Sequence, residues 1–249
     1  MNIPSDLRIK IFADGANLEE ILRLAKDPMI KGFTTNPTLM RKAGIEDYET
    51  FARDVLAEIV DRPVSFEVFA DDLDGMVAQG FEIAGWGPNV NVKIPVTNTQ
   101  GESTVPVVER LVAEGVVVNV TAVFTLDQVR AITAALDASV PAIVSVFAGR
   151  IADTGRDPIP HMREAVEILR DRPKAELIWA SPRELLNVFH ADESGCHIIT
   201  VTNDILAKLA NAGKSLETFS LETVKMFHED AAGAGYEIQT DPGKLKLVR

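Results

Sequence analysis

Eight short runs rich in β-branched residues alternate along this chain with eight amphipathic stretches of helical periodicity. The expected strands cover residues 8–13, 32–35, 64–69, 89–94, 116–121, 142–147, 176–180 and 198–201. The expected helices cover residues 18–26, 47–60, 73–86, 104–114, 126–135, 160–170, 182–189 and 203–211. This alternation implies βαβ units and a parallel sheet. Because a doubly wound sheet more often stops at five or six strands, eight units in 249 residues predict an α/β fold, the closed (β/α)8 TIM barrel.

One domain is expected over residues 1–249, because no stretch rich in Pro, Gly or Ser separates two halves. The barrel is expected at about 8–213, followed by a C-terminal helix and tail at 214–249. The additional helix is placed at about 215–233, and the final GKLKLVR segment is interpreted as a mobile basic tail.

Helix punctuation agrees with this division of the chain. Asp47, Thr125 and Ser181 have side chains suited to capping a helix N-terminus. Pro160 and Pro182 stand where a proline in the first helical turn is tolerated.

The charge balance restricts the partners. A formal net charge of −12 argues against nucleic acid or an anionic membrane as the main partner, since both bind basic surfaces. The N-terminus lacks the apolar stretch of a signal peptide, and no apolar run has the length of a membrane span, so a cytoplasmic protein is expected. A phosphorylated substrate would need a local cluster of cations or backbone amides.

Strand parity sorts polar from apolar side chains. In the fourth strand, Val92 and Ile94 share one face, and Asn91 and Lys93 share the other. The apolar face should meet the helices, which leaves Lys93 pointing into the barrel. Other inward or strand-end polar positions are Asp14, Thr34, Asn36, Glu67, Asn119, Thr121 and Ser145, with Phe147 on the same face of its strand as Ser145. These positions fall near the C-terminal strand ends, where barrels of this type carry their active sites.

A buried lysine beside two carboxylates favours one chemistry. Desolvation disfavours the ammonium form of Lys93, and the neutral amine can attack a ketone to form an imine. Asp14 and Glu67 could then carry the proton transfers, as in a sugar aldolase. The alternative is a structural ion-pair network. No pair of histidines has metal-ligand spacing, and no dinucleotide or P-loop motif follows a strand, so neither metal nor cofactor is predicted.

An anion site is predicted after the sixth and seventh strands. Arg150 lies in VFAGRI, and Ser181 and Arg183 lie in ASPREL. In such barrels a phosphate commonly binds over the last strands, at a helix N-terminus. The alternative for Arg150 is a salt bridge to Asp153 or to another neighbour.

At these positions the sequence resembles the transaldolase family, including its short members and the fructose-6-phosphate aldolases. The resemblance covers seven of the eight expected strands in order. The matching stretches are FADGAN (Asp14), GFTTNPTLM (Thr34, Asn36), VSFEVFA (Glu67), VKIPVT (Lys93), VNVTAVFT (Asn119, Thr121), SVFAGRI (Ser145, Phe147, Arg150) and ASPREL (Ser181, Arg183).

The resemblance implies a role for each residue. Lys93 resembles the Schiff-base lysine, Asp14 the acid/base that cleaves the C–C bond, and Glu67 with Thr121 the pair that holds a relay water. The implied substrate contacts are Thr34, Asn36, Asn119, Ser145 and Phe147, with Arg150, Ser181 and Arg183 as the sugar-phosphate clamp. The family implies sugar-phosphate substrates of the pentose phosphate pathway and no cofactor. A homo-oligomer stays open, because related short proteins form rings and the C-terminal helix could cross to a neighbour.

Two residues favour transaldolase over aldolase within this resemblance. The aldolase branch has Gln where this chain has Glu67 and Tyr where it has Phe147. Pro182 and the extra residue in VTNTQG depart from the family pattern and leave the exact sugars open. The alternatives are a fructose-6-phosphate aldolase-like lyase and, from another class, a non-catalytic barrel that binds sugar phosphates.

Overall fold

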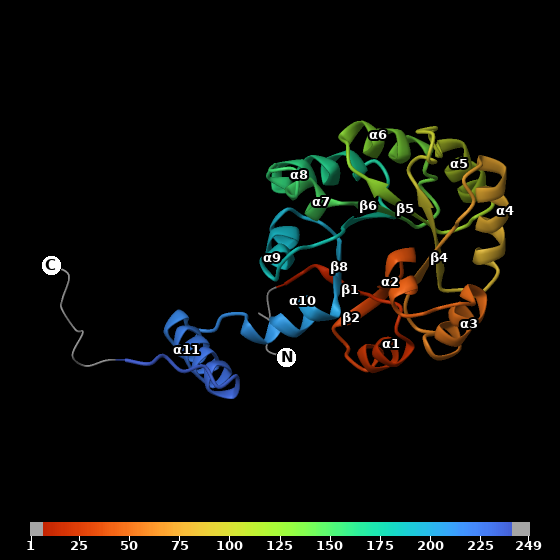
Figure 1. Ribbon diagram of the computed structural model, residues 1–249. Coiled ribbons are helices and arrows are strands. Elements are labelled where there is room, and N and C mark those ends of the chain that lie inside the picture. Colours follow the sequence, from red (N-terminus) through yellow and green to blue (C-terminus); the bar gives the residue numbers. More distant parts are fainter. Residues whose placement is uncertain (1–6, 241–249) are drawn as a thin grey trace.

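A computed structural model describes residues 7–240 and contains, within that range, a closed barrel of eight parallel strands (Figure 1). Neighbouring strands follow the chain order, and the last strand pairs with the first to close the barrel. The predicted TIM barrel is therefore confirmed. The strands are β1 (Lys10–Asp14), β2 (Ile30–Thr34), β3 (Val64–Glu67), β4 (Val90–Pro95), β5 (Val118–Val123), β6 (Ala142–Val146), β7 (Ala175–Trp179) and β8 (Ile198–Thr202).

Most of the helices lie around the outside of the ring of strands (Figure 1). Two short helices, α2 (Pro37–Lys42) and α7 (Ala148–Ala152), follow β2 and β6. Sequence periodicity does not predict them, because five or six residues are too few to show a helical period. The helices are α1 (Leu18–Ala25), α2 (Pro37–Lys42), α3 (Tyr48–Glu58), α4 (Leu73–Ala84), α5 (Val105–Ala113), α6 (Leu126–Ala135), α7 (Ala148–Ala152), α8 (Pro158–Leu169), α9 (Leu186–Glu193), α10 (Asn203–Lys208) and α11 (Leu216–Gly233), and the 3-10 turn η1 (Leu209–Asn211) follows α10.

Local capping explains where several helices begin. The Asp47 side chain accepts a hydrogen bond from Thr50 N–H, and Thr125 forms a reciprocal capping box with Gln128, as the sequence predicts. The prediction that Ser181 caps a helix containing Pro182 is wrong, because α9 begins only at Leu186.

The turn that precedes α9 is held in another way. Ser181 has a φ of 60°, and the Asn187 side-chain carbonyl accepts hydrogen bonds from the backbone N–H groups of Arg183 at 2.8 Å and Glu184 at 3.3 Å. In a helix that began at Pro182, the N–H groups of Arg183 and Glu184 would need a capping partner; here the Asn187 side chain accepts from both.

Two apolar layers enclose the barrel wall. Val90, Val92 and Ile94 belong to the large cluster between strands and helices, as their parity predicts. A smaller cluster fills the barrel interior and consists of Phe12, Ile143, Ile178, Ala180 and Ile198, with Phe147 packed against it. Because Phe12 and Ile143 lie two residues before Asp14 and Ser145 on the same strand faces, this apolar plug forms the floor beneath the polar mouth.

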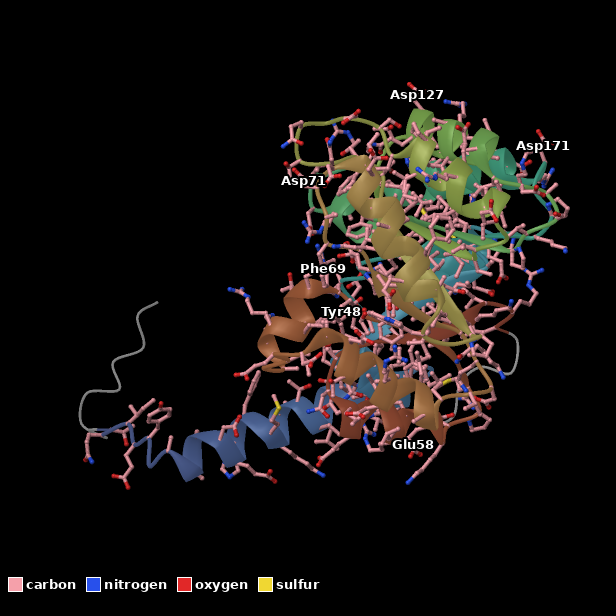
Figure 2. The ribbon with its side chains drawn as sticks, turned by 90° about the vertical axis from the view of Figure 1, so that its right-hand side faces the viewer. Tyr48, Glu58, Phe69, Asp71, Asp127 and Asp171 are labelled. Atoms are coloured by element: carbon pink, nitrogen blue, oxygen red, sulfur yellow. The ribbon has the colours of Figure 1, made fainter. Side chains whose placement is uncertain are left out.

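The last helix, α11, stands apart from the barrel (Figures 1 and 2). None of its residues is buried. Large apolar side chains on it are exposed, among them Leu216 at 79%, Val224 at 61% and Phe227 at 63%. No helix between residues 7 and 240 has both the length and the apolar composition that crossing a membrane requires. The predicted basic tail lies outside the described residues.

Candidate active site

Lys93 lies near the C-terminal end of β4 with its side chain 8% exposed. Its Nζ donates a hydrogen bond to the backbone carbonyl of Thr35 at 2.7 Å and lies 3.0 Å from Oε2 of Glu67. Parallel pairing of β3 with β4 sets Glu67 directly beside Lys93. A buried cation of this kind is costly unless it is paired, and here a carboxylate and a carbonyl provide that compensation.

Glu67 is fixed through its backbone by Tyr48, a residue that the sequence analysis did not single out. The Tyr48 hydroxyl lies 2.6 Å from the Glu67 N–H, from which it accepts, and 3.1 Å from the Glu67 carbonyl, to which it donates. The ring packs against Phe69 at 4.7 Å and Trp86 at 5.4 Å between centroids, and Figure 2 shows Tyr48 close to Phe69. Burial raises the pKa of the Tyr48 phenol, so the hydroxyl keeps its proton.

Asp14 ends β1 and accepts two side-chain hydrogen bonds, from Thr34 Oγ1 at 2.8 Å and from Asn36 Nδ2 at 3.2 Å. Burial raises the pKa of the Asp14 carboxyl above its ordinary value, and the nearby Lys93 ammonium and the two donors only partly offset that shift. Asn36 also caps α2, because its side-chain carbonyl accepts the Leu39 N–H at 3.0 Å. The start of a short helix therefore orients the amide towards Asp14.

A buried amide network lies beside the lysine. Asn119 is fully buried; its Nδ2 donates to Ser65 Oγ at 3.1 Å, and its Oδ1 accepts from Ser145 Oγ at 2.7 Å. Thr121 is buried in the irregular part of β5, where the register with β6 shifts and Ala122 has a φ of 57°. Bulges of this kind re-aim side chains next to active sites.

The predicted anion site contains two arginines in different situations. The Arg150 guanidinium lies 5.7 Å from the centroid of the Phe147 ring, and among residues 7–240 no carboxylate lies within 4.0 Å of it. The considered salt bridge from Arg150 to Asp153 is therefore wrong. Asp153 pairs with Arg183 instead, and Arg183 Nη1 also donates to Ser181 Oγ at 3.1 Å.

A cavity of about 550 Å³ opens at this end of the barrel. It brings together eleven of the twelve predicted site residues: Asp14, Thr34, Asn36, Glu67, Lys93, Thr121, Ser145, Phe147, Arg150, Ser181 and Arg183. The twelfth, Asn119, does not line the cavity and hydrogen-bonds to Ser145, which does.

The cavity also contains residues that sequence reasoning missed. Thr200 lines the cavity and shares a hydrogen bond with Thr34. The sequence could have identified Thr200, because it lies two residues after the inward-facing Ile198, on the same face of the strand. Phe124 had no such signal, because it follows the irregular end of β5. No group of three or more His, Cys, Asp or Glu side chains within residues 7–240 is arranged to hold a metal ion.

A buried lysine–carboxylate pair, a second carboxylate and two arginines at the mouth of one barrel define a TIM-barrel enzyme with a lysine-centred site. The chain belongs to the transaldolase/fructose-6-phosphate aldolase family, whose model matches residues 11–241. A probable transaldolase of Dehalococcoides mccartyi is 37% identical over 202 residues, or 81% of this chain and 90% of that protein. A probable transaldolase of Roseiflexus sp. is 40% identical over 200 residues, or 80% of this chain and 88% of that protein.

The fold is also similar to that of a solved structure outside this family. The crystal structure of 2,3-dimethylmalate lyase, a member of the PEP mutase/isocitrate lyase superfamily, has a TM-score of 0.55 at 13% identity. The match covers 96% of this chain and 89% of that chain. At that identity the likeness concerns the barrel fold alone.

Proposed function

We propose that the protein is a transaldolase that moves a dihydroxyacetone unit between sugar phosphates through a Schiff base on Lys93. Membership in the family and the names of its relatives support the reaction type. The observation that carries the assignment of the nucleophile is the position of Lys93 Nζ, which is buried and 3.0 Å from Glu67 in a cavity that Asp14 also lines.

The first half-reaction uses the lysine and both carboxylates. Transfer of a proton from Lys93 to Glu67 frees the amine, which attacks the ketone carbon and, after loss of water, leaves a protonated imine. Thr121, at the same mouth, is proposed to hold the relay water with Glu67. Asp14 then takes the proton of the hydroxyl on the carbon beyond the breaking bond. The C–C electrons move to the imine, and an aldehyde leaves.

The second half-reaction reverses these steps with another aldehyde. The enamine attacks the acceptor carbonyl, Asp14 returns its proton to the new hydroxyl, and hydrolysis of the imine restores Lys93. The raised pKa of Asp14 supports this role, because a carboxyl that ionises above its ordinary range exchanges protons more readily near neutral pH. Thr34, Asn36, Ser145 and, through Ser145, Asn119 are proposed to orient the sugar hydroxyls.

The phosphate is proposed to bind between Arg150 and Arg183, with Ser181 and the Phe147 ring beside it. All four line the same cavity as the lysine. In a protein with a formal net charge of −12, two arginines at one side of a cavity are a local exception that suits an anionic group.

Acceptor dependence tests the proposed transfer. Incubation with fructose 6-phosphate alone should release glyceraldehyde 3-phosphate once per enzyme and then stop, because the three-carbon unit stays on Lys93. Adding erythrose 4-phosphate should restore continuous turnover. Accumulation of free dihydroxyacetone without an acceptor would instead indicate a fructose-6-phosphate aldolase. Absence of any product from either mixture would favour a non-catalytic sugar-phosphate-binding barrel.

The cellular setting follows from this substrate chemistry. We place the enzyme in the cytoplasm and in the pentose phosphate pathway, because phosphorylated sugars are charged and stay in the compartment in which they are made. Neither nucleic acid nor a membrane is proposed as a partner. Subcellular fractionation tests the location, and loss of interconversion among C4, C6 and C7 sugar phosphates in a deletion strain tests the pathway.

The exposed helix α11 supports a homo-oligomer. Leu216, Phe219, Val224 and Phe227 leave a large apolar surface on a helix that has no buried residue in the part of the chain that the structure describes. A second copy that covers this surface would remove the cost of exposing it. The mass in solution tests this proposal: the full chain should be a multimer, and Phe227→Glu should shift it towards the monomer.

A further inference from the structure

Both arginines of the proposed phosphate clamp depend on the five-residue helix α7. Arg150 belongs to this helix, and Asp153 is its C-cap residue. Arg183 comes from the turn after β7 and reaches back to Asp153, with its Nε at 2.9 Å from Oδ1 and 3.1 Å from Oδ2. Its Nη2 donates to Oδ2 as well. The contact is therefore bidentate, which fixes both the position and the plane of a guanidinium.

The same two segments also touch through their backbones. The Gly149 N–H donates to the Ala180 carbonyl at 3.3 Å, and a Cβ built on Gly149 would lie 1.6 Å from the Ser181 carbonyl oxygen. Gly149 thus sets how closely the turn approaches α7. The Arg183–Asp153 contact then sets where the side chain of that turn points.

The hydrogen-bond inventory of Arg183 shows what remains for a ligand. A guanidinium has five N–H donors. The Asp153 carboxylate takes the Nε edge and one Nη2 donor, and Ser181 Oγ takes one Nη1 donor. One donor on each terminal nitrogen is left, on a side chain that lines the cavity. Two such donors match two oxygens of a phosphate monoester.

The ion pair contributes little to the stability of the fold. The side chains of Arg183 and Asp153 are 45% and 51% exposed, and solvent screening leaves an ion pair this exposed with little effect on stability. Hydrogen bonds from Arg183 lower the pKa of Asp153, so the carboxylate stays ionised at neutral pH. The well-defined geometry of a weakly stabilising pair indicates a role in orientation.

We propose that Asp153 is a positioning residue that aims Arg183 at the phosphate of the sugar substrate. This inference rests on the proposed phosphate clamp. A different effect of the same carboxylate would have the opposite sign: as an anion close to the clamp, Asp153 would compete with the phosphate, and its removal would tighten binding.

The experiment compares Asp153→Ala with Asp153→Asn. The ratio of kcat/KM for fructose 6-phosphate to that for unphosphorylated fructose, both with a fixed acceptor, is measured for each variant. Asp153→Ala should lower this ratio by about 10- to 100-fold, mainly through a higher KM, because a misplacement of the order of 1 Å has that effect. Asp153→Asn should give a smaller loss than Asp153→Ala, because the amide oxygen still accepts from Arg183 although the amide nitrogen cannot.

Glu49→Ala is the matched control. It removes a carboxylate from the exposed Arg53–Glu49 pair on α3 and should leave the ratio unchanged. A lower KM for fructose 6-phosphate in both Asp153 variants would overturn the proposal, because it would indicate that the Asp153 carboxylate competes with the phosphate. Equal losses for both ketoses would overturn it in favour of a general structural effect.

Borohydride trapping on every variant separates this inference from the proposed function. If wild type forms the Lys93 adduct and prefers the phosphorylated ketose, but Asp153→Ala keeps that preference, only the role of Asp153 is refuted. If wild type shows no preference for the phosphorylated ketose, the clamp is refuted and the role of Asp153 with it.

Discussion

Gly149→Ala is the substitution whose effect the structure predicts most specifically. The new Cβ would lie 1.6 Å from the Ser181 carbonyl oxygen, 2.6 Å from the Ser181 carbonyl carbon and 3.4 Å from the Pro182 Cα. All three atoms belong to the backbone, so no side-chain rotation relieves the contact. The turn after β7 must move away from α7, by roughly 1.5–2 Å if a normal carbon–oxygen separation is to be restored.

The size of the effect follows from that displacement. Overpacking of a close contact costs about 1–3 kcal/mol, which lowers the melting temperature of a chain of this size by roughly 2–12 °C. Because the moving turn carries Ser181 and Arg183, kcat/KM for fructose 6-phosphate should fall by about 100-fold. The value for unphosphorylated fructose should change much less, since Lys93 and Asp14 lie on other strands.

Thermal unfolding and steady-state kinetics on the two ketoses measure both effects. Gly15→Ala is the control for stability, because Gly15 follows Asp14 near the mouth and a Cβ there meets nothing within 4 Å. Wild-type melting temperature and wild-type preference for fructose 6-phosphate in Gly149→Ala would refute the reasoning.

Three further predictions concern single side chains. Asp14→Asn should abolish turnover yet stabilise the protein at pH 7. Folding raises the pKa of Asp14, so the unfolded chain releases this proton more readily and wild-type stability falls as the pH rises; the gain from the substitution should vanish below about pH 4. Tyr48→Phe should cost about 1–3 kcal/mol in urea unfolding, because it leaves the Glu67 N–H without its partner, and kcat should fall more than KM rises. Arg150→Ala should weaken binding of phosphorylated ketoses more than of unphosphorylated ones.

Each of these has a contrary outcome. A stability difference between Asp14→Asn and wild type that does not grow from pH 4 to pH 7 would contradict the raised pKa. Unchanged unfolding and unchanged kcat in Tyr48→Phe would show that its hydroxyl does not support Glu67. An equal loss for both kinds of ketose in Arg150→Ala would argue against its role in the clamp.

Strand parity made most of the site predictable from the sequence. The alternation of polar and apolar residues in β4 and β1 was enough to predict that Lys93 and Asp14 point into the barrel. The apolar residues of each strand pack against the helices, so the residues between them face the barrel interior. Thr200 obeys the same rule and could have been found with it.

The remaining features depend on contacts between distant segments. From the sequence, Asp153 is a possible partner for Arg150, three residues earlier, but in the structure it pairs with Arg183, because the turn after β7 approaches the end of α7. The support of Glu67 by Tyr48 joins a helix end to a strand end across an aromatic cluster. The left-handed backbone at Ser181 also has no local signal, since serine followed by proline resembles an ordinary helix start.

The most direct test of the account is peptide mapping after borohydride reduction with fructose 6-phosphate. A Schiff base on Lys93 predicts a reduced three-carbon or six-carbon adduct on the peptide that contains Lys93, and none on Lys93→Met, which should melt cooperatively and remain inactive. An adduct on another lysine, or turnover by Lys93→Met, would contradict it.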